Sequence, residues 1–301
     1  MGKYLIRDFE ALSGIKAHTI RIWEQRYGIL KPDRSRTNIR QYSDDDLRYL
    51  LNLSLLNRNG MKISALAKMN RSEIEQKVKS ITSTNFEYSN QIDALTLAMA
   101  QFNEAEFERI INMNIAHLRF ETAMEEIVFP FLRKIGVMWQ TGSINPAQEH
   151  FMSNLIRQKL IVAIDRMENE VEKVRVKSIL FLPEGELHEL PLLYLNYLLK
   201  RNGHHVMYLG QNVPFNDLEQ VDSVFKADYV FSIFTSYPRQ LQVAAYVTRL
   251  SKIFSRSRIL LSGFLICKSR LKFPANIRPV MEIKDLREII TEGMTSSNRQ
   301  S

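Results

Sequence analysis

Apolar and polar positions near the start of the chain alternate with a helical period, in short stretches interrupted by turn residues. Leu5–Ser13 and Lys16–Tyr27 predict two helices, and Gly14 between them supplies the permissive backbone of a tight turn. The second helix has an apolar face of Ile20, Trp23 and Tyr27, and a polar face of His18, Arg21 and Gln25. This layout is typical of a helix-turn-helix, whose second helix enters the major groove of DNA.

A basic, turn-rich segment follows Gly28. Pro32 and the stretch Asp33–Asn38 predict a turn between two short strands. The segment suits a wing that lies along DNA phosphates, and its candidate contacts are Arg34, Arg36, Arg40 and Tyr42. Ser43, followed by three acidic residues, predicts the start of a third helix that runs through about Asn57. Residues 1–75 therefore predict a winged helix-turn-helix domain.

The middle of the chain changes character. Residues 76–90 lack a strong pattern and predict a linker, whereas residues 91–168 have helical apolar spacing throughout. Pro130 predicts a kink or an early end of its helix. Four helices in this length predict a compact four-helix bundle. Two apolar stripes carry the prediction: Phe107, Ile110, Ile111, Ile115 and Leu118, then Met124, Ile127, Val128, Phe131, Leu132 and Ile135.

Residues 174–292 alternate β-branched runs with helical stretches at about 189–202, 216–226 and 238–255. This alternation predicts a Rossmann-like (flavodoxin-like) α/β domain, in which a parallel sheet has helices on both faces and binds ligands at the carboxyl ends of its strands. Residues 293–301 predict a flexible tail. The predicted strands are Val176–Leu182, Val206–Leu209, Asp228–Phe234, Arg258–Leu261 and Ile277–Ile283.

Charge and composition narrow the classes of function. Residues 1–79 hold 16 Lys and Arg against 9 Asp and Glu, a net of +7 out of +8 for the whole chain. A positive field confined to one end indicates a polyanion partner there. The single cysteine, Cys267, excludes an internal disulfide and a cysteine-built zinc site. No apolar run reaches 18 residues and the start does not resemble a signal peptide, so we expect a cytoplasmic protein without a membrane span.

Two short segments carry candidate chemistry. The loop PEGELHELP after the first predicted strand places Glu186 and His188 at a strand end, where a carboxylate could hold an imidazole in one tautomer for a metal. Two exposed polar loop residues are the alternative. Trp139 is followed after nine residues by Glu149 and His150, which on composition alone are a Trp beside a loop and a charged pair at a helix start. No Ser/His/Asp or paired-carboxylate arrangement suggests an enzyme.

The run TIRIWEQRYGILKPDRSRTNIRQYS, followed by a helix and NGMKISALAKM, resembles the winged-helix domain of the MerR family over nearly all of residues 3–70. The RIWE-x-RYG form is similar to the branch that includes the CarH, LitR and MlrA-like regulators. The alternative is that Trp23 and Tyr42 are core aromatics and the arginines are merely solvated. The resemblance implies contacts with double-stranded operator DNA from His18, Thr19, Arg21, Trp23, Arg26, Arg34, Arg36, Arg40 and Tyr42.

Residues 91–290 resemble the cobalamin-binding half of the same group. Its D-x-H-x-x-G loop, S-x-L strand end and G-G pair correspond in order and spacing to Glu186–Pro191, Ser232–Phe234 and Ser262-Gly263. The resemblance implies adenosylcobalamin as cofactor, with His188 as the metal ligand below cobalt and Glu186 as its partner. Ser232 would meet the nucleotide tail, and Ser262 and Gly263 would let the backbone approach it. The upper side would be lined by Trp139, Glu149 and His150.

The chain departs from this pattern at five positions, of which Glu186 in place of aspartate is a mild change. Pro191 and Ser262 each replace a glycine, and Phe234 replaces a leucine beside the expected tail tunnel. Gln140 stands where the photoreceptors of the group have a histidine, which puts their ligand change after photolysis in doubt.

The reading that we favour is a transcription regulator, a repressor, that senses light through adenosylcobalamin and cofactor-dependent self-association into a dimer or tetramer. The alternative is a regulator of the same fold that binds no cobalamin and uses its C-terminal half for oligomerisation, another ligand or a protein partner. A third reading, a subunit of a corrinoid-dependent methyltransferase or mutase, would need a substrate-activating domain, whereas residues 1–75 resemble a DNA reader.

Overall fold

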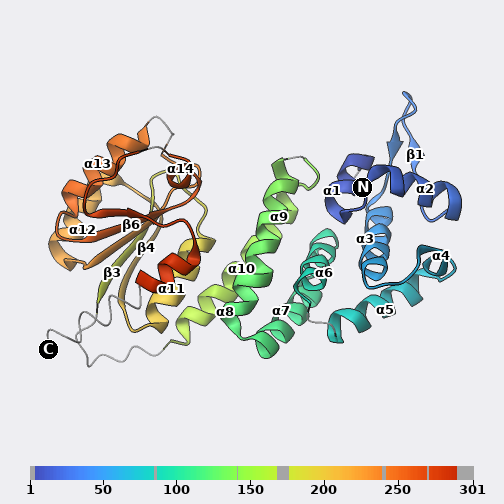
Figure 1. The fold of residues 1–301 in the computed structure, drawn as a ribbon, viewed down its shortest axis with the longest axis horizontal. Coiled ribbons are helices and arrows are strands. Elements are labelled where there is room, and N and C mark those ends of the chain that lie inside the picture. Colours follow the sequence, from blue (N-terminus) through green and yellow to red (C-terminus); the bar gives the residue numbers. More distant parts are fainter. Residues whose placement is uncertain are drawn as a thin grey trace. The chain divides into compact units, whose positions relative to one another are not determined.

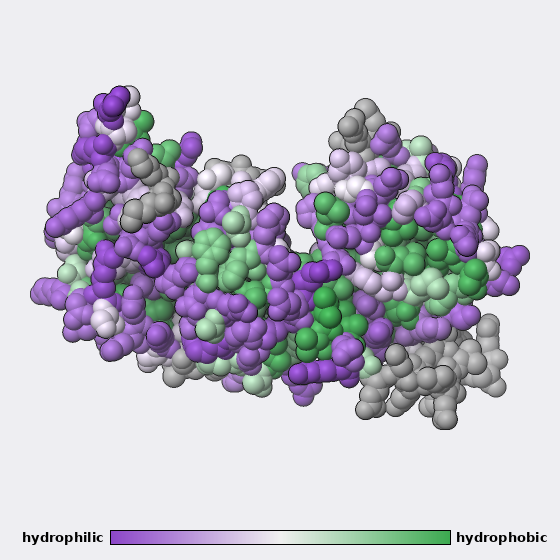
Figure 2. All heavy atoms as spheres, turned by 180° about the vertical axis from the view of Figure 1, so that it is seen from behind, coloured by the Kyte–Doolittle hydropathy of each residue, from purple (hydrophilic) through white to green (hydrophobic). Residues whose placement is uncertain are grey.

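The computed structural model describes residues 4–84, 87–140, 142–167, 176–238, 242–269 and 271–289. The chain divides into two units, Met1–Ile156 and Arg157–Ser301, which are described here separately (Figure 1). The expected tail at 293–301 lies outside the described residues. None of the described helices is long and apolar enough to cross a lipid bilayer. Figure 2 shows a mainly hydrophilic surface with smaller hydrophobic areas.

The N-terminal unit begins with the predicted winged helix-turn-helix. Gly14 and Gly28, which end the first two helices, have φ values of 72° and 62°, a region that side chains disfavour. Ser43 caps the third helix, since its Oγ accepts a hydrogen bond from the Asp46 N–H at 3.1 Å. The elements are α1 (Ile6–Ser13), α2 (Ala17–Tyr27), the antiparallel pair β1 (Asp33–Arg34) and β2 (Arg40–Gln41), α3 (Asp44–Arg58) and α4 (Ile63–Leu66).

A helix replaces most of the predicted linker. α5 (Arg71–Thr84) covers the first part of residues 76–90, and α6 begins at Tyr88. The stripe that buries α5 consists of Ile74, Val78 and Thr82, spaced four residues apart. Only two of these three side chains are apolar, so the stripe is too weak to identify from the sequence. The segment is therefore a packed helix where the sequence predicted a linker.

The helical middle agrees with the predicted bundle, but Pro130 acts differently from the expectation. The chain stays helical through Pro130, which follows a π-helical turn, η1 (Met124–Val128). Proline has no N–H for the regular helical ladder, and a wider turn is one way in which a helix accommodates that interruption. The elements around it are α6 (Tyr88–Ala100), α7 (Glu104–Leu118), α8 (Phe120–Ala123), α9 (Phe129–Gln140) and α10 (Pro146–Asp165).

The C-terminal unit has the predicted parallel sheet, with strand order β4-β3-β5-β6-β7. α12 and α13 pack on one face over a core that includes Phe181, Val230 and Phe234. α11 packs on the other face over Leu180 and Phe231 (Figure 1). The elements are β3 (Lys177–Pro183), α11 (Leu190–Arg201), β4 (His205–Val213), η2 (Phe215–Asp217), α12 (Leu218–Phe225), β5 (Tyr229–Ile233), α13 (Val243–Ile253), β6 (Arg258–Ser262), α14 (Phe264–Cys267) and β7 (Ile277–Pro279).

Candidate functional site

The strand order gives the C-terminal unit a topological switch point. β3 has β4 on one side and β5 on the other, and the helices that follow β3 and β5 cover opposite faces of the sheet. Doubly wound sheets bind ligands outside the carboxyl ends of the strands at such a switch point. The loop with Glu186 and His188 follows β3 at this point.

Glu186 joins the two loops at the switch point. Its side chain is fully buried, and both carboxylate oxygens accept hydrogen bonds. Because one oxygen serves the loop after β3 and the other serves the loop after β5, a single carboxylate fixes both. Oε1 accepts from the Leu187 N–H at 3.0 Å, the His188 N–H at 3.1 Å and the His188 Nδ1 at 2.5 Å, and Oε2 accepts from the N–H groups of Thr235 at 2.9 Å, Ser236 at 2.6 Å and Tyr237 at 3.1 Å.

These hydrogen bonds keep Glu186 ionised and fix which ring nitrogen of His188 donates to it. Burial raises the pKa of Glu186, but the hydrogen bonds from His188 and from backbone N–H groups outweigh it and hold the pKa at about 2. The ionised carboxylate can only accept, so Nδ1 of His188 donates and the lone pair of the imidazole lies on Nε2. The imidazole is 57% exposed. A neutral imidazole oriented by a carboxylate is a suitable ligand for a transition metal such as cobalt.

Exposed apolar side chains lie at the strand ends on the same edge of the sheet as this histidine. They follow four neighbouring strands, β3, β5, β6 and β7, so they lie along the same edge of the sheet. An exposed apolar edge of this kind is typical of a surface that binds a partner or a large apolar ligand. The side chains are Leu187, Tyr237, Phe264 and Met281.

Pro191 does not disturb the loop as its replacement of glycine suggested. It lies in the first turn of α11, where an N–H is not required and the fixed φ of proline suits a helix. Glu189, directly after His188, fixes this end of the loop. Its carboxylate accepts hydrogen bonds from Arg157 Nε at 2.8 Å and from the Tyr208 hydroxyl at 2.9 Å. The loop that carries His188 is therefore held by a carboxylate on each side of the histidine.

The residues expected at the nucleotide tail fit it only in part. The hydroxyl of Ser232 is buried and has no hydrogen-bond partner among the described residues. A buried hydroxyl of this kind suits a polar ligand group that would supply the missing hydrogen bond. Phe234 is fully buried and packs edge-on against Tyr246, with ring centroids 5.3 Å apart. Gly263 has a φ of 99°, and a Cβ there would lie 2.5 Å from the Phe234 carbonyl oxygen. The close approach of the chain's own backbone therefore accounts for a glycine at position 263. The Ser262 carbonyl oxygen accepts a hydrogen bond from the Phe234 N–H at 2.8 Å.

The expected upper-side residues lie in the N-terminal unit. Trp139 is 56% exposed near the end of α9. Glu149 and His150 lie in the first turn of α10 and pair with each other, with 2.9 Å between Glu149 Oε2 and His150 Nδ1. The side chain of Gln140 is outside the described residues. Trp139 and His150 are both largely exposed and are therefore available for contact with a ligand.

The winged helix-turn-helix presents most of its predicted contacts to solvent. His18, Arg21 and Arg26 on α2, and Arg34 and Arg36 in the wing, are exposed, and Thr19 is half-buried. The two aromatic residues differ from the expectation. Trp23 is 7% exposed and Tyr42 is 1% exposed, because both pack in the core, where the Tyr42 ring stacks on Phe9 with centroids 4.3 Å apart. Trp23 and Tyr42 therefore pack beneath the exposed side chains of α2 and the wing and do not belong to the exposed surface.

Glu24 connects the recognition helix to the wing. Its carboxylate accepts Arg40 Nε at 3.0 Å and the Tyr42 hydroxyl at 3.2 Å. The sequence did not indicate three sets of contacts. These are the contacts of Glu24 with Arg40 and Tyr42, the hydrogen bonds from the N–H groups of residues 235–237 to Glu186, and the contact of Arg157 with Glu189. Only Glu189 had a local signal, its place directly after His188.

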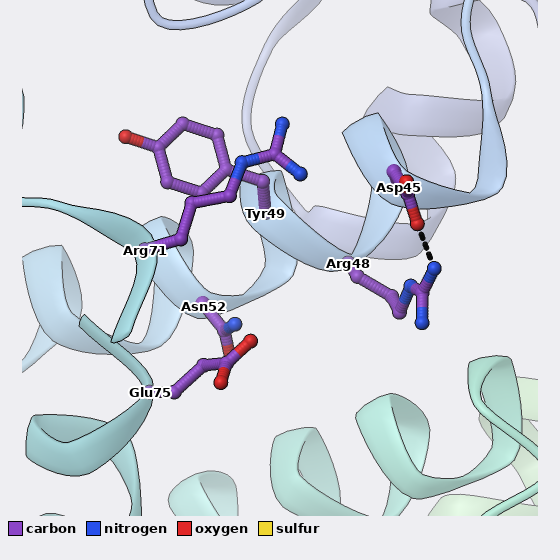
Figure 3. A pocket seen from close by; sticks show the side chains of 6 residues that line it. All are labelled: Asp45, Arg48, Tyr49, Asn52, Arg71 and Glu75. Atoms are coloured by element: carbon purple, nitrogen blue, oxygen red, sulfur yellow. Dashed lines mark ion pairs between the residues drawn. The ribbon is translucent and has the colours of Figure 1, made fainter. Parts of the chain in front are cut away.

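A separate polar cavity of about 140 Å³ lies between α3 and α5 (Figure 3). Arg71 lies over the Tyr49 ring, with 5.0 Å from Cζ to the centroid, and Arg48 pairs with Asp45. Pockets for drug-sized ligands are larger, about 300–1,000 Å³, and mostly apolar. This cavity is therefore no candidate for a corrin.

Comparison with known proteins gives two family matches. Residues 4–73 match the MerR HTH regulatory protein family, and residues 91–163 match the B12 binding domain family. The chain is 29% identical over 233 residues to the HTH-type transcriptional repressor CarH of Myxococcus xanthus, covering 75% of this chain and 77% of the relative. It is 28% identical over 211 residues to the transcriptional repressor CarA of the same organism, covering 69% and 68%.

The fold also resembles that of a solved corrinoid protein. The monomethylamine corrinoid protein of Methanosarcina barkeri aligns with a TM-score of 0.57 and 14% identity, over 68% of this chain and 99% of that protein. At this identity the likeness concerns the fold alone. Residues 4–73 are therefore similar to a MerR-type helix-turn-helix domain, residues 91–163 are similar to the B12 binding domain family, and the parallel sheet has the fold of a corrinoid protein, in the order that the sequence predicted.

Proposed function

We propose that this protein is a transcriptional regulator, a repressor, whose C-terminal half binds adenosylcobalamin and uses it to sense light. The observation that carries the proposal is the buried Glu186 carboxylate, which holds His188 with Nε2 as the acceptor nitrogen at the switch point of the sheet. The proposal is supported by relatives that are transcriptional repressors, which favours a regulator over an enzyme.

Operator recognition rests on the N-terminal unit. The net charge of +7 over residues 1–79 provides attraction to phosphates. The exposed side chains of α2 are available to read base edges, whereas those of the wing are suited to phosphates. We expect a partly palindromic operator bound by a dimer or a larger assembly, because one small reading head has limited affinity.

His188 would hold the cobalt through its Nε2, and Glu186 would keep its imidazole in the binding tautomer. Trp139, Glu149 and His150 would line the adenosyl side. When bound, the cofactor supplies a cobalt–carbon bond that light can break. The surfaces of the bundle and of the sheet would become ordered when the cofactor is bound. The ordered surfaces would favour self-association and operator binding.

A second candidate function is a regulator of the same fold that binds no cobalamin. The packing at the tail region favours it, because Phe234 is fully buried against Tyr246 and its backbone lies against Gly263. The C-terminal half would then serve self-association or take another ligand.

One experiment separates the two candidates. The protein is incubated with adenosylcobalamin in the dark, desalted, and its absorption spectrum is recorded before and after illumination. We expect a coloured protein with a histidine-ligated spectrum that changes on illumination. His188→Ala should lose that spectrum and retain less cofactor, whereas His150→Ala should keep the dark spectrum. A colourless wild-type protein would overturn the cobalamin proposal and favour the second candidate.

A further inference from the structure

The DNA-binding head (residues 4–84) and the bundle (residues 87–156) belong to one unit of the chain. The sequence predicted a linker between them, but the last turns of α5 are packed instead. Three separate sets of polar contacts connect the head to the bundle, at α1, at the end of α3 and at the end of α5. Polar contacts depend strongly on distance and angle, so together they specify one arrangement of the two parts.

The contact at α3 is an ion cluster around Asp93 of α6. Arg58, at the end of α3, lies 2.5 Å from Asp93 Oδ2, and Lys134 of α9 lies 3.1 Å from Asp93 Oδ1. The Asp93 side chain is only 9% exposed. A buried carboxylate between two cations from different elements holds both, because separation would leave the charge desolvated and unpaired. Beside it, Asn59 and Asn90 exchange two amide hydrogen bonds at 2.8 and 3.1 Å.

The contact at α5 is a chain of buried amides. Asn114 of α7 donates to the side-chain oxygen of Gln91 at 2.8 Å, and Gln91 of α6 donates to the Thr82 carbonyl at 3.2 Å. Arg109 of α7 also donates to the Thr82 hydroxyl at 3.1 Å. Thr82, Gln91 and Asn114 are all buried, so the end of α5 is fixed in the interior of the unit and cannot act as a free hinge.

The contact at α1 comes from the turn just beyond Trp139. Ser143 in that turn donates to Asp8 Oδ1 at 3.3 Å, and both residues are buried. The other oxygen of Asp8 accepts the Leu5 N–H at 2.7 Å and so closes the start of α1. α1 leads through Gly14 into the recognition helix α2. Lys134, on the Asp93 cluster, lies on the same helix as Trp139.

We infer that the DNA-binding head is held rigidly on its own bundle by these three contacts, and that the Asp93 cluster and the Ser143–Asp8 contact relay the state of the Trp139 surface to α3 and α1. The relay part rests on the proposed function, because it requires a ligand at Trp139. A displacement of α9 or of the turn after it would break or strain contacts that orient the recognition helix. DNA affinity would thus respond within a single chain, in addition to any change in self-association.

The rigidity is tested by a distance measurement on the full chain. Cys267, which is exposed, is replaced by Ser, and spin labels are placed at Ala11→Cys on α1 and Ala105→Cys on α7, both exposed positions. We expect one narrow distance distribution by pulsed electron resonance. Asp93→Asn should broaden it. The matched control is Asp45→Asn, which removes a carboxylate that pairs with Arg48 inside α3 and should leave the distribution narrow.

Arg58→Gln provides a second variant, since it removes only the cation from the head and keeps Asp93 with Lys134. It should broaden the distribution even if Asp93→Asn fails to fold. A broad distribution in the unmodified pair, or variants that match the Asp45→Asn control, would overturn the inference without any reference to cofactor.

The relay is tested by operator affinity at fixed salt, with and without adenosylcobalamin in the dark. We expect the cofactor to strengthen binding at least about 5-fold in the wild-type protein, within the usual range of allosteric coupling. In Asp93→Asn this ratio should fall toward 1, while affinity without cofactor stays within about 2-fold of wild type. An unchanged ratio in a variant with a loosened head would overturn the relay. A wild-type protein that binds no cofactor would overturn the proposed function and the relay, whereas the distance measurement would still decide the rigidity.

Discussion

Two carboxylate–histidine pairs in this protein have similar composition and very different surroundings. Glu186 and His188 lie at the strand ends of the C-terminal unit, and Glu149 and His150 lie in the first turn of α10 in the N-terminal unit. The Glu186 side chain is fully buried and accepts six hydrogen bonds, whereas the Glu149 side chain is 34% exposed and its histidine 72% exposed. An exposed pair exchanges its contacts with water at little cost.

The comparison separates a histidine held in one orientation from a histidine that can reorient. At His188 the carboxylate is itself held by two loops, so the imidazole keeps one tautomer and one direction before any ligand arrives. At His150 the histidine can turn toward whatever binds beside Trp139. The backbone donors around the glutamate, more than the pair itself, therefore decide which histidine is preorganised.

The largest effect is expected when the buried carboxylate is changed. Glu186→Gln keeps the shape but places an amide NH₂ among groups that only donate, so the free energy of unfolding should fall by about 3 kcal/mol or more. Denaturant unfolding of the full chain measures this. Glu149→Gln is the matched control and should change stability by less than about 0.5 kcal/mol. Equal effects of the two substitutions would remove the distinction between the pairs.

His204 extends the comparison to a buried histidine whose hydrogen-bond partner is a hydroxyl group. His204 bonds to Ser178 Oγ at 2.8 Å, and burial lowers its pKa from 6.5 to about 4. Above pH 6.5 the histidine is neutral in both states. As the pH falls from about 6.5 to 4, the unfolded chain takes up the proton first, so stability should decline by up to about 3 kcal/mol.

Urea unfolding at several pH values measures this decline. His204→Gln removes the titrating group, so the difference in stability between wild type and variant should shrink as the pH falls through this window. A difference that is independent of pH would show that His204 does not carry the effect.

The smallest effects are expected in the N-terminal unit. There Glu24 pairs with Arg40, and the exposure of its carboxylate, 13%, lies between the exposures of the other two glutamates. Arg21→Ala removes an exposed side chain of the recognition helix and should weaken specific binding by about 1–3 kcal/mol if Arg21 reaches a base edge. Arg40→Ala should weaken binding to all sequences and flatten its salt dependence. Titrations of specific and unrelated duplexes at several salt concentrations measure both. If Arg40→Ala changed specificity alone, its assignment to phosphates would be wrong.

The sequence predicted the sheet well because its three central strands, β3, β5 and β6, are mostly buried and appear as apolar runs. β3, for example, is found within one residue of its predicted position. Glu186 and His188 were found because they are adjacent in one loop. The N–H groups of residues 235–237 could not be, since a backbone donor has no residue-type signature and becomes a partner only through folding. α5 was missed because Thr82 completes its buried stripe, and Trp23 and Tyr42 were assigned to DNA because an aromatic side chain suits both a core and an interface.

The π-helical turn at Met124–Val128 sets the rotational phase of everything that follows it on α9. A π turn holds one residue more than a regular turn, so deleting one residue within it would restore a regular helix and keep the phase of Lys134 and Trp139. In a regular helix each residue advances about 100° around the axis, so the same deletion between this turn and Lys134 would rotate both side chains by about that angle. The turn can therefore absorb the loss of a residue that would re-aim both side chains if it occurred further along the helix.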